Sequence, residues 1–163
     1  MIDDSVALVN KHRSTGILVD SNLLLVLFVG LEKREWVGQR KRVKEYSPWQ
    51  FDLLDAMVSD ARLLTTPNIA TEVSNLSGLL DSEVSQAVKR NLAAFLQTYD
   101  EEYIDSKFTS EHDAFAKLGI TDTVLLHLAE SGKLVLTADW PLARRLESND
   151  YPVVNFNHMY ELG

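Results

Sequence analysis

Short apolar segments typical of buried strands alternate with segments typical of helices along almost the whole chain. The strand patterns occupy residues 16–20, 62–66, 103–105, 133–137 and 151–156. Helix patterns start at residue 22 and recur at residues 33–46, 48–61, 67–80, 82–98, 110–119, 122–131 and 141–149. Such alternation favours a parallel sheet with helices on both faces. The sequence therefore predicts an α/β fold, a three-layer sandwich with a central, mostly parallel sheet of about five short strands.

The 163-residue chain has no internal repeat, low-complexity stretch or flexible linker, so we expect one domain, 1–163. Residues 1–14 are expected to form a short N-terminal helix or arm. Cysteine is absent, which excludes disulfides, thiol nucleophiles and thiolate metal sites. No apolar run is long enough to cross a membrane, and the acidic start of the chain is unlike a secretory signal. We therefore expect a cytoplasmic protein that has no membrane partner.

Acidic residues stand where predicted strands end and predicted helices begin. Asp20 follows the first strand, Asp139 follows the fourth, and Asp122 falls in the first turn of a predicted helix. Glu72 comes about two helical turns after the second strand. Because parallel sheets bind ligands beyond the carboxyl ends of their strands, these four acids are the candidate catalytic residues.

Each of these acids taken alone has a structural explanation, since a carboxylate at a helix N-terminus gains about 0.3–1 kcal/mol there. Taken together they point to a cation, because several carboxylates at one sheet edge repel one another unless a positive charge lies between them. A cluster made only of oxygen ligands favours Mg²⁺ or Mn²⁺ over zinc.

Four short segments contain these acids in a characteristic order. They are Val19-Asp20-Ser21-Asn22, Thr66-Pro67 with Glu72-Val73, Leu118-Gly119-Ile120-Thr121-Asp122 and Leu136-Thr137-Ala138-Asp139. In series, on the expected strands and helices, they resemble the PIN-domain family of small ribonucleases, which includes toxins. The resemblance covers nearly the whole chain and implies a compact α/β sandwich with a parallel sheet.

The resemblance also implies a Mg²⁺- or Mn²⁺-dependent endoribonuclease whose products carry a 5′-phosphate and a 3′-hydroxyl. Asp20, Glu72, Asp122 and Asp139 match its acidic quartet by position. Asp20 and Asp122 are expected to be the principal metal ligands. Asp139 and Glu72 are expected to bind a second ion or to hold metal-bound water. The small polar residues that support such a quartet correspond here to Asn22 and Thr137.

The formal net charge of −8 weighs against nucleic-acid binding by general electrostatics. A cation that neutralises the acids, or a local basic patch, would overcome this. Residues 31–45 hold six basic and three acidic residues, a local charge of +3, with Trp36 as a candidate stacking aromatic. A solvated helix face explains the same pattern. The candidate nucleic-acid contacts are Lys33, Arg34, Arg40, Lys41, Arg42 and Lys44, together with Arg144 in the predicted helix after Asp139.

Other functions stay open on the sequence alone. A receiver-like signalling domain also carries acids at strand ends, but it needs an acidic pair at the first strand, and residues 14–16 supply none. A PIN-like fold can bind RNA or protein without cutting, and the same site can cut DNA. Small members of the family include toxins held by an antitoxin, so an antitoxin and a second copy of this chain are candidate partners beside RNA. The segment 31–63 is longer than the resemblance leads one to expect, which leaves the substrate open.

Overall fold

The computed structural model describes residues 2–162, with side chains described for residues 3–159. Its sheet contains five parallel strands in the order β3-β2-β1-β4-β5. The strands are β1 (Ile17–Val19), β2 (Leu63–Thr65), β3 (Asp100–Glu101), β4 (Leu134–Thr137) and β5 (Val153–Asn155). The predicted α/β class and the parallel sheet of short strands are confirmed. The first and last residues of the predicted domain, Met1 and Gly163, lie outside the described residues.

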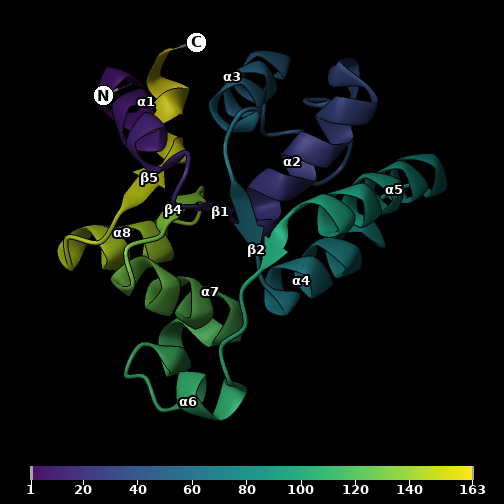
Figure 1. Ribbon diagram of the computed structural model, residues 1–163. Coiled ribbons are helices and arrows are strands. Elements are labelled where there is room, and N and C mark those ends of the chain that lie inside the picture. Colours follow the sequence, from purple (N-terminus) through teal and green to yellow (C-terminus); the bar gives the residue numbers. More distant parts are fainter. Residues whose placement is uncertain (1, 163) are drawn as a thin grey trace.

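Helices cover both faces of this sheet. In Figure 1, α2, α4 and α5 lie on one side of the strands, and α7 and α8 lie on the other. The helices of residues 2–162 are α1 (Ile2–His12), α2 (Ser21–Glu32), α3 (Pro48–Val58), α4 (Pro67–Ser77), α5 (Ser82–Thr98), α6 (Ser106–Ser110), α7 (Phe115–Glu130) and α8 (Trp140–Ser148), with 3-10 helices η1 (Arg34–Trp36) and η2 (Phe156–Leu162). No helix among these is long and apolar enough to cross a membrane.

The strand order reverses between β1 and β4. From β1 the chain proceeds outward through β2 to β3, and it then returns to place β4 on the opposite side of β1. The registers align Ile17 with Leu63 on one side and with Leu134 on the other, so the three central strands end at nearly the same level. In open parallel sheets, such a reversal leaves a crevice at the carboxyl ends of the strands where ligands bind.

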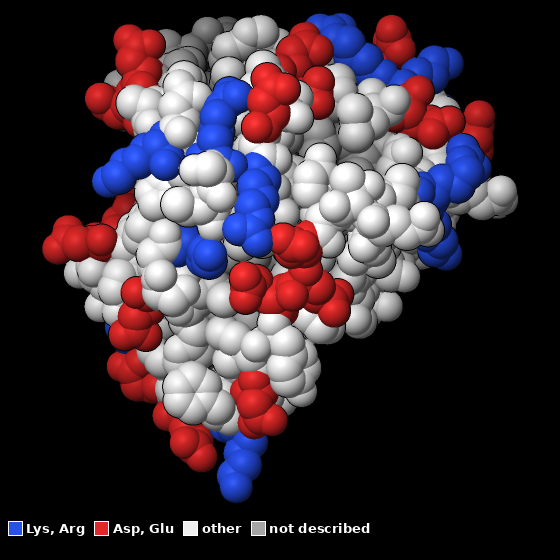
Figure 2. Space-filling view, in the orientation of Figure 1, with Lys and Arg blue, Asp and Glu red and all other residues white. Residues whose placement is uncertain are grey.

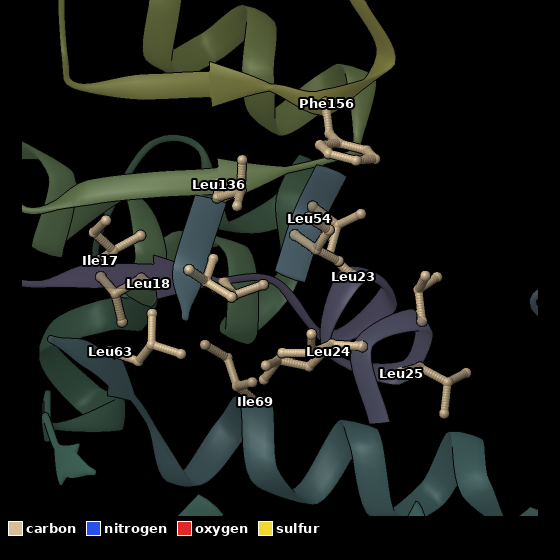
Figure 3. Packing of buried hydrophobic residues seen from close by; sticks show 14 of the residues in the cluster. Ile17, Leu18, Leu23, Leu24, Leu25, Leu54, Leu63, Ile69, Leu136 and Phe156 are labelled. Carbon is tan, nitrogen blue, oxygen red and sulfur yellow. The ribbon is translucent and has the colours of Figure 1, made fainter. Parts of the chain in front are cut away.

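The apolar core is built around α2. Every residue from Leu23 to Gly30 is buried, which explains why this helix shows no polar face in the sequence. Leu24 of α2 and Ile69 of α4 lie together in one apolar layer against the strands (Figure 3). Phe28 meets Phe95 of α5 in an edge-to-face contact with 5.5 Å between ring centroids. This packing fixes the N-terminal end of α2, and with it the residue that follows β1.

The prediction of a helix over residues 33–46 is wrong. Only η1 is helical there, and turns follow it. Two residues take left-handed backbone conformations, Gly38 with φ of 88° and Arg42 with φ of 72°, and neither fits a right-handed helix. The basic spacing had suggested a helix face, but buried Val37 and Val43 instead anchor an irregular loop.

The region between α5 and β4 also differs from the prediction. The strand expected at residues 103–105 lies at β3, Asp100–Glu101, where both residues are exposed. A two-residue polar edge strand offers no apolar pattern, so the sequence could not reveal it. The helix expected at 110–119 divides into α6, which ends at Ser110, and the first part of α7. The other elements match their predicted segments, with ends shifted by up to three residues.

Candidate carboxylate site at the sheet edge

The four predicted catalytic acids line one small cavity, which lies at the carboxyl ends of β1 and β4. Its volume is about 80 Å³. The acids arrive from four separate segments: the ends of β1 and β4, the middle of α4 and the centre of α7. The lining residues are Asp20, Ser21, Asn22, Glu72, Asp122 and Asp139.

Asp20 is the most firmly held of the acids. It follows β1, caps the N-terminus of α2 and is only 5% exposed. Its Oδ1 accepts a hydrogen bond from the amide of Leu23 at 2.9 Å, and its Oδ2 accepts one from the amide of Ala138 at 2.9 Å. The hydroxyl of Thr137 also donates to Oδ2. Because three donors from two segments converge on this carboxylate, its position is set by the packing of β1 against β4.

Thr137 fixes the relation between Asp20 and Asp139. Its side chain is fully buried at the end of β4. While its hydroxyl donates to Asp20, its Oγ1 accepts a hydrogen bond from the amide of Asp139 at 3.0 Å. Asp139 then caps α8 by accepting from the amide of Leu142 at 2.8 Å. One hydroxyl group thus joins two acids that belong to different strands, which is the arrangement expected of a supporting residue.

Asp122 is placed by a break in α7. Gly119 has φ of 79° and ψ of −179°, so the helix is interrupted there and restarts directly afterwards. The hydroxyl of Thr123 donates to the carbonyl of Gly119 at 2.7 Å and closes the first turn of the new segment. Asp122 belongs to that turn, as the sequence pattern predicted, and its side chain is half-buried. Glycine suits this position because side chains rarely adopt a positive φ.

Glu72 reaches the cavity from α4 and is the most exposed of the four acids. α4 starts as predicted, with Thr66 as its cap and Pro67 in its first turn. The hydroxyl of Ser21 donates to Oε2 of Glu72 at 2.7 Å. Sequence reasoning assigns Ser21 no role, since a serine beside a helix cap has many structural explanations. Its position next to Asp20 was the only available signal.

The electrostatics of the cavity disfavour a full set of negative charges. Burial raises the pKa of Asp122 to about 7, and the charges of Asp139, Asp20 and Glu72 add to this effect. Burial likewise raises the pKa of Asp20, with a further contribution from the charge of Asp139, although its hydrogen bonds act in the opposite direction. The site therefore retains a proton near neutral pH unless a cation replaces it.

The donor set fits a hard divalent cation in its chemistry. All the acids offer carboxylate oxygen, which Mg²⁺ and Mn²⁺ prefer. As the side chains stand, however, residues 3–159 contain no group of three or more His, Cys, Asp or Glu side chains arranged to hold a metal ion. Asp20 and Asp139 are tied to backbone amides, whereas Glu72 is exposed and Asp122 only half-buried.

Comparison with known proteins does not assign this chain to a family. No family model matches it, and no curated protein matches it. The chemistry of the site is therefore inferred from its own residues.

The basic residues predicted to contact nucleic acid do not form one patch. Arg34 forms a two-bond ion pair with Asp52, at 2.6 and 2.7 Å, and Arg40 lies 3.6 Å from Asp81. Trp36 is only 6% exposed and Arg40 lies over its ring, so its prediction as a stacking aromatic is wrong. Figure 2 shows basic side chains in several groups, with acidic side chains between and beside them on that face.

Two hollows lined in part by basic residues contain some of the predicted nucleic-acid contacts. One, of about 410 Å³, is lined by Asn22 together with Lys41, Arg42 and Lys44 from the loop before α3. Asn22 also lines the carboxylate cavity, so the two hollows share this residue. The other, of about 500 Å³, lies along α8 and includes Arg144. Of the predicted contacts, Lys33 lies over the ring of Trp36 at 6.0 Å and lines neither hollow.

Proposed function

We propose that this chain is a ribonuclease of the PIN-domain type that hydrolyses phosphodiester bonds with the help of Mg²⁺ or Mn²⁺. One observation carries the proposal: acids from four separate segments line a single cavity at the point where the strand order reverses. A mere helix cap explains Asp20 and Asp139 individually, but it does not explain why Glu72 and Asp122 open into the same space.

The cost of assembling these acids supports a role in cation binding. The fold holds Asp122 with a pKa of about 7 partly because three other acids surround it. A structural role gains nothing from such repulsion, whereas a bound divalent cation would be stabilised by it. Perturbed carboxyl groups gathered in a cleft are typical of functional sites.

The proposed roles of the residues follow from the contacts that hold each side chain. A bound divalent cation supplies an activated water and neutralises charge on the phosphate. Asp20, fixed by three hydrogen bonds, and Asp122 would hold the cation. Asp139 and Glu72 would orient water or bind a second ion, and Ser21 would restrain Glu72 through the hydrogen bond at 2.7 Å. Thr137 would keep Asp20 and Asp139 in register.

A cleavage assay with matched variants tests the proposal. Purified protein is incubated with end-labelled RNA and with DNA of the same sequence, in Mg²⁺, Mn²⁺ or chelator. Asp20→Asn and Asp122→Asn should each lower the rate at least about 100-fold, because each removes a charged ligand. Asp60→Asn is the control, since its side chain is 82% exposed and outside the site. Cleavage that survives chelator or both site variants would refute the metal mechanism.

The same assay separates the alternatives. RNA binding without cleavage in any of the metals would support a catalytically silent PIN-like binding module. Faster cleavage of DNA than of RNA would make the chain a DNA-directed nuclease. Isothermal calorimetry measures Mn²⁺ binding independently of activity. Mn²⁺ binding should disappear in Asp122→Asn but persist in Asp60→Asn.

A further inference from the structure

The larger of the two basic hollows is lined by the residue that directly follows Asp139 in the chain. Asp139 caps α8, and Trp140 is the first residue of that helix. Trp140, Arg144 and Ser148 are spaced four apart, so they share one face of α8. Lys117, from the part of α7 before its break, also lines the hollow. The hollow measures about 500 Å³ and is lined by Lys117, Trp140, Pro141, Arg144, Arg145 and Ser148.

Trp140 presents a large aromatic ring to solvent in this hollow. Its exposed fraction is 48%, and the ring of His158 meets it in an edge-to-face contact with 5.8 Å between centroids. The other tryptophans differ, since Trp36 is buried and Trp49 lines none of the described hollows near the site. A braced but exposed indole is a surface on which a flat aromatic ligand can stack.

The charges around Trp140 favour an anion. Lys117 and Arg144 are exposed, and within residues 3–159 the structure records no ion pair for either of them. Arg145 differs, because it donates to both carboxylate oxygens of Asp113 at 2.9 Å. Neither cationic side chain has an acidic partner in the described part of the chain, so both can bind a phosphate group. The acids alone would repel that phosphate.

We propose that this hollow binds one unpaired nucleotide of the substrate strand, adjacent to the phosphate that is cut, with its base stacked on Trp140 and a phosphate held by Arg144 and Lys117. This inference rests on the proposed nuclease function and adds a substrate class to it. A base inside a duplex has both faces covered by its neighbours, so stacking on Trp140 requires a single strand or an extruded base.

A binding measurement without turnover tests the subsite. Asp122→Asn full-length protein is titrated with a fluorescent single-stranded RNA, and with the same RNA carrying one abasic nucleotide beside the central phosphate. Trp140→Leu should weaken binding of the intact strand about tenfold, whereas Trp140→Phe, which retains an aromatic face, should restore most of it. Trp49→Leu is the matched control and should leave binding unchanged. Arg144→Gln should weaken binding and reduce its dependence on salt.

A double-mutant cycle gives the decisive comparison. If the base stacks on Trp140, the abasic strand should bind the parent and the Trp140→Leu variant equally well, because each change removes the same contact. Independent, additive losses would refute the subsite, as would binding of a blunt duplex as tight as that of the single strand. Cleavage that is unaffected in Trp140→Leu would refute the subsite and leave the nuclease proposal intact. If the effects of Trp140→Leu and of the abasic nucleotide are coupled but the protein never cleaves, the nuclease proposal would be refuted and the subsite would stand.

Discussion

Removing the charge of Asp122 should stabilise the metal-free protein, and by an amount that depends on pH. In the folded chain its pKa rises to about 7, from 3.8 in the unfolded chain. Below pH 3.8 the carboxyl group is protonated in both states, so it costs the folded state nothing. Between the two pKa values the folded state retains a proton that the unfolded state has released, so the free energy of unfolding falls as pH rises. Above the folded pKa the destabilisation is complete.

The magnitude follows from the size of this pKa change. Each pKa unit corresponds to about 1.36 kcal/mol, so the upper limit for Asp122 is about 4 kcal/mol. Its side chain is half-buried, and solvent screening lowers the expected value to about 2 kcal/mol. For a chain of this length that corresponds to an increase of about 4–8 °C in Tm.

Thermal unfolding followed by circular dichroism checks this prediction. In chelator, Asp122→Asn should melt above the wild type at about pH 8, and the difference should shrink toward about pH 4. Mg²⁺ should raise the Tm of the wild type and narrow the gap, because the variant lacks a ligand. Asp60→Asn, with a side chain 82% exposed, should show no such pH dependence. Equal Tm values for Asp122→Asn and wild type at about pH 8 would refute the reasoning that burial and the neighbouring acids disfavour a charged Asp122 in this cavity.

Three further substitutions probe the support of the site and the packing of the fold. Thr137→Val should lower the cleavage rate about 10- to 100-fold and the free energy of unfolding in urea by about 1–3 kcal/mol, because Asp20 loses a buried hydrogen-bond donor. Thr137→Ser should restore both. A fully active Thr137→Val variant would contradict the positioning role of Thr137. Gly30→Ala should lower the free energy of unfolding by about 1–3 kcal/mol in the same assay, because the added Cβ would lie 2.2 Å from the ring of Phe51. An unchanged free energy of unfolding would mean that α3 shifts freely. Arg42→Gly should raise the free energy of unfolding by about 0.5–1 kcal/mol, because glycine adopts a φ of 72° without strain. A lower free energy of unfolding would indicate that the arginine side chain supports the loop.

The candidate site shows where pattern reasoning succeeds and where it stops. Asp20 and Asp139 were found because each ends an apolar strand and caps the next helix, and both signals are local. Ser21 was missed because its partner, Glu72, lies on another helix. Trp36 is predicted at the surface because it stands among charged residues, yet it is only 6% exposed and Arg40 lies over its ring. Burial depends on which distant segments pack against a residue, and the neighbouring residues in the sequence do not indicate those segments.

The sequence by itself determined the alternation of strands and helices, the parallel sheet and the identity of the acids at the strand ends. These follow from apolar periodicity and from capping, which act over a few residues. Only the tertiary structure decided that Thr137 joins Asp20 to Asp139 and that Lys117 and Trp140 line the same hollow. Such relations arise when segments distant along the chain pack together, and they are fixed by the order and register of the whole sheet.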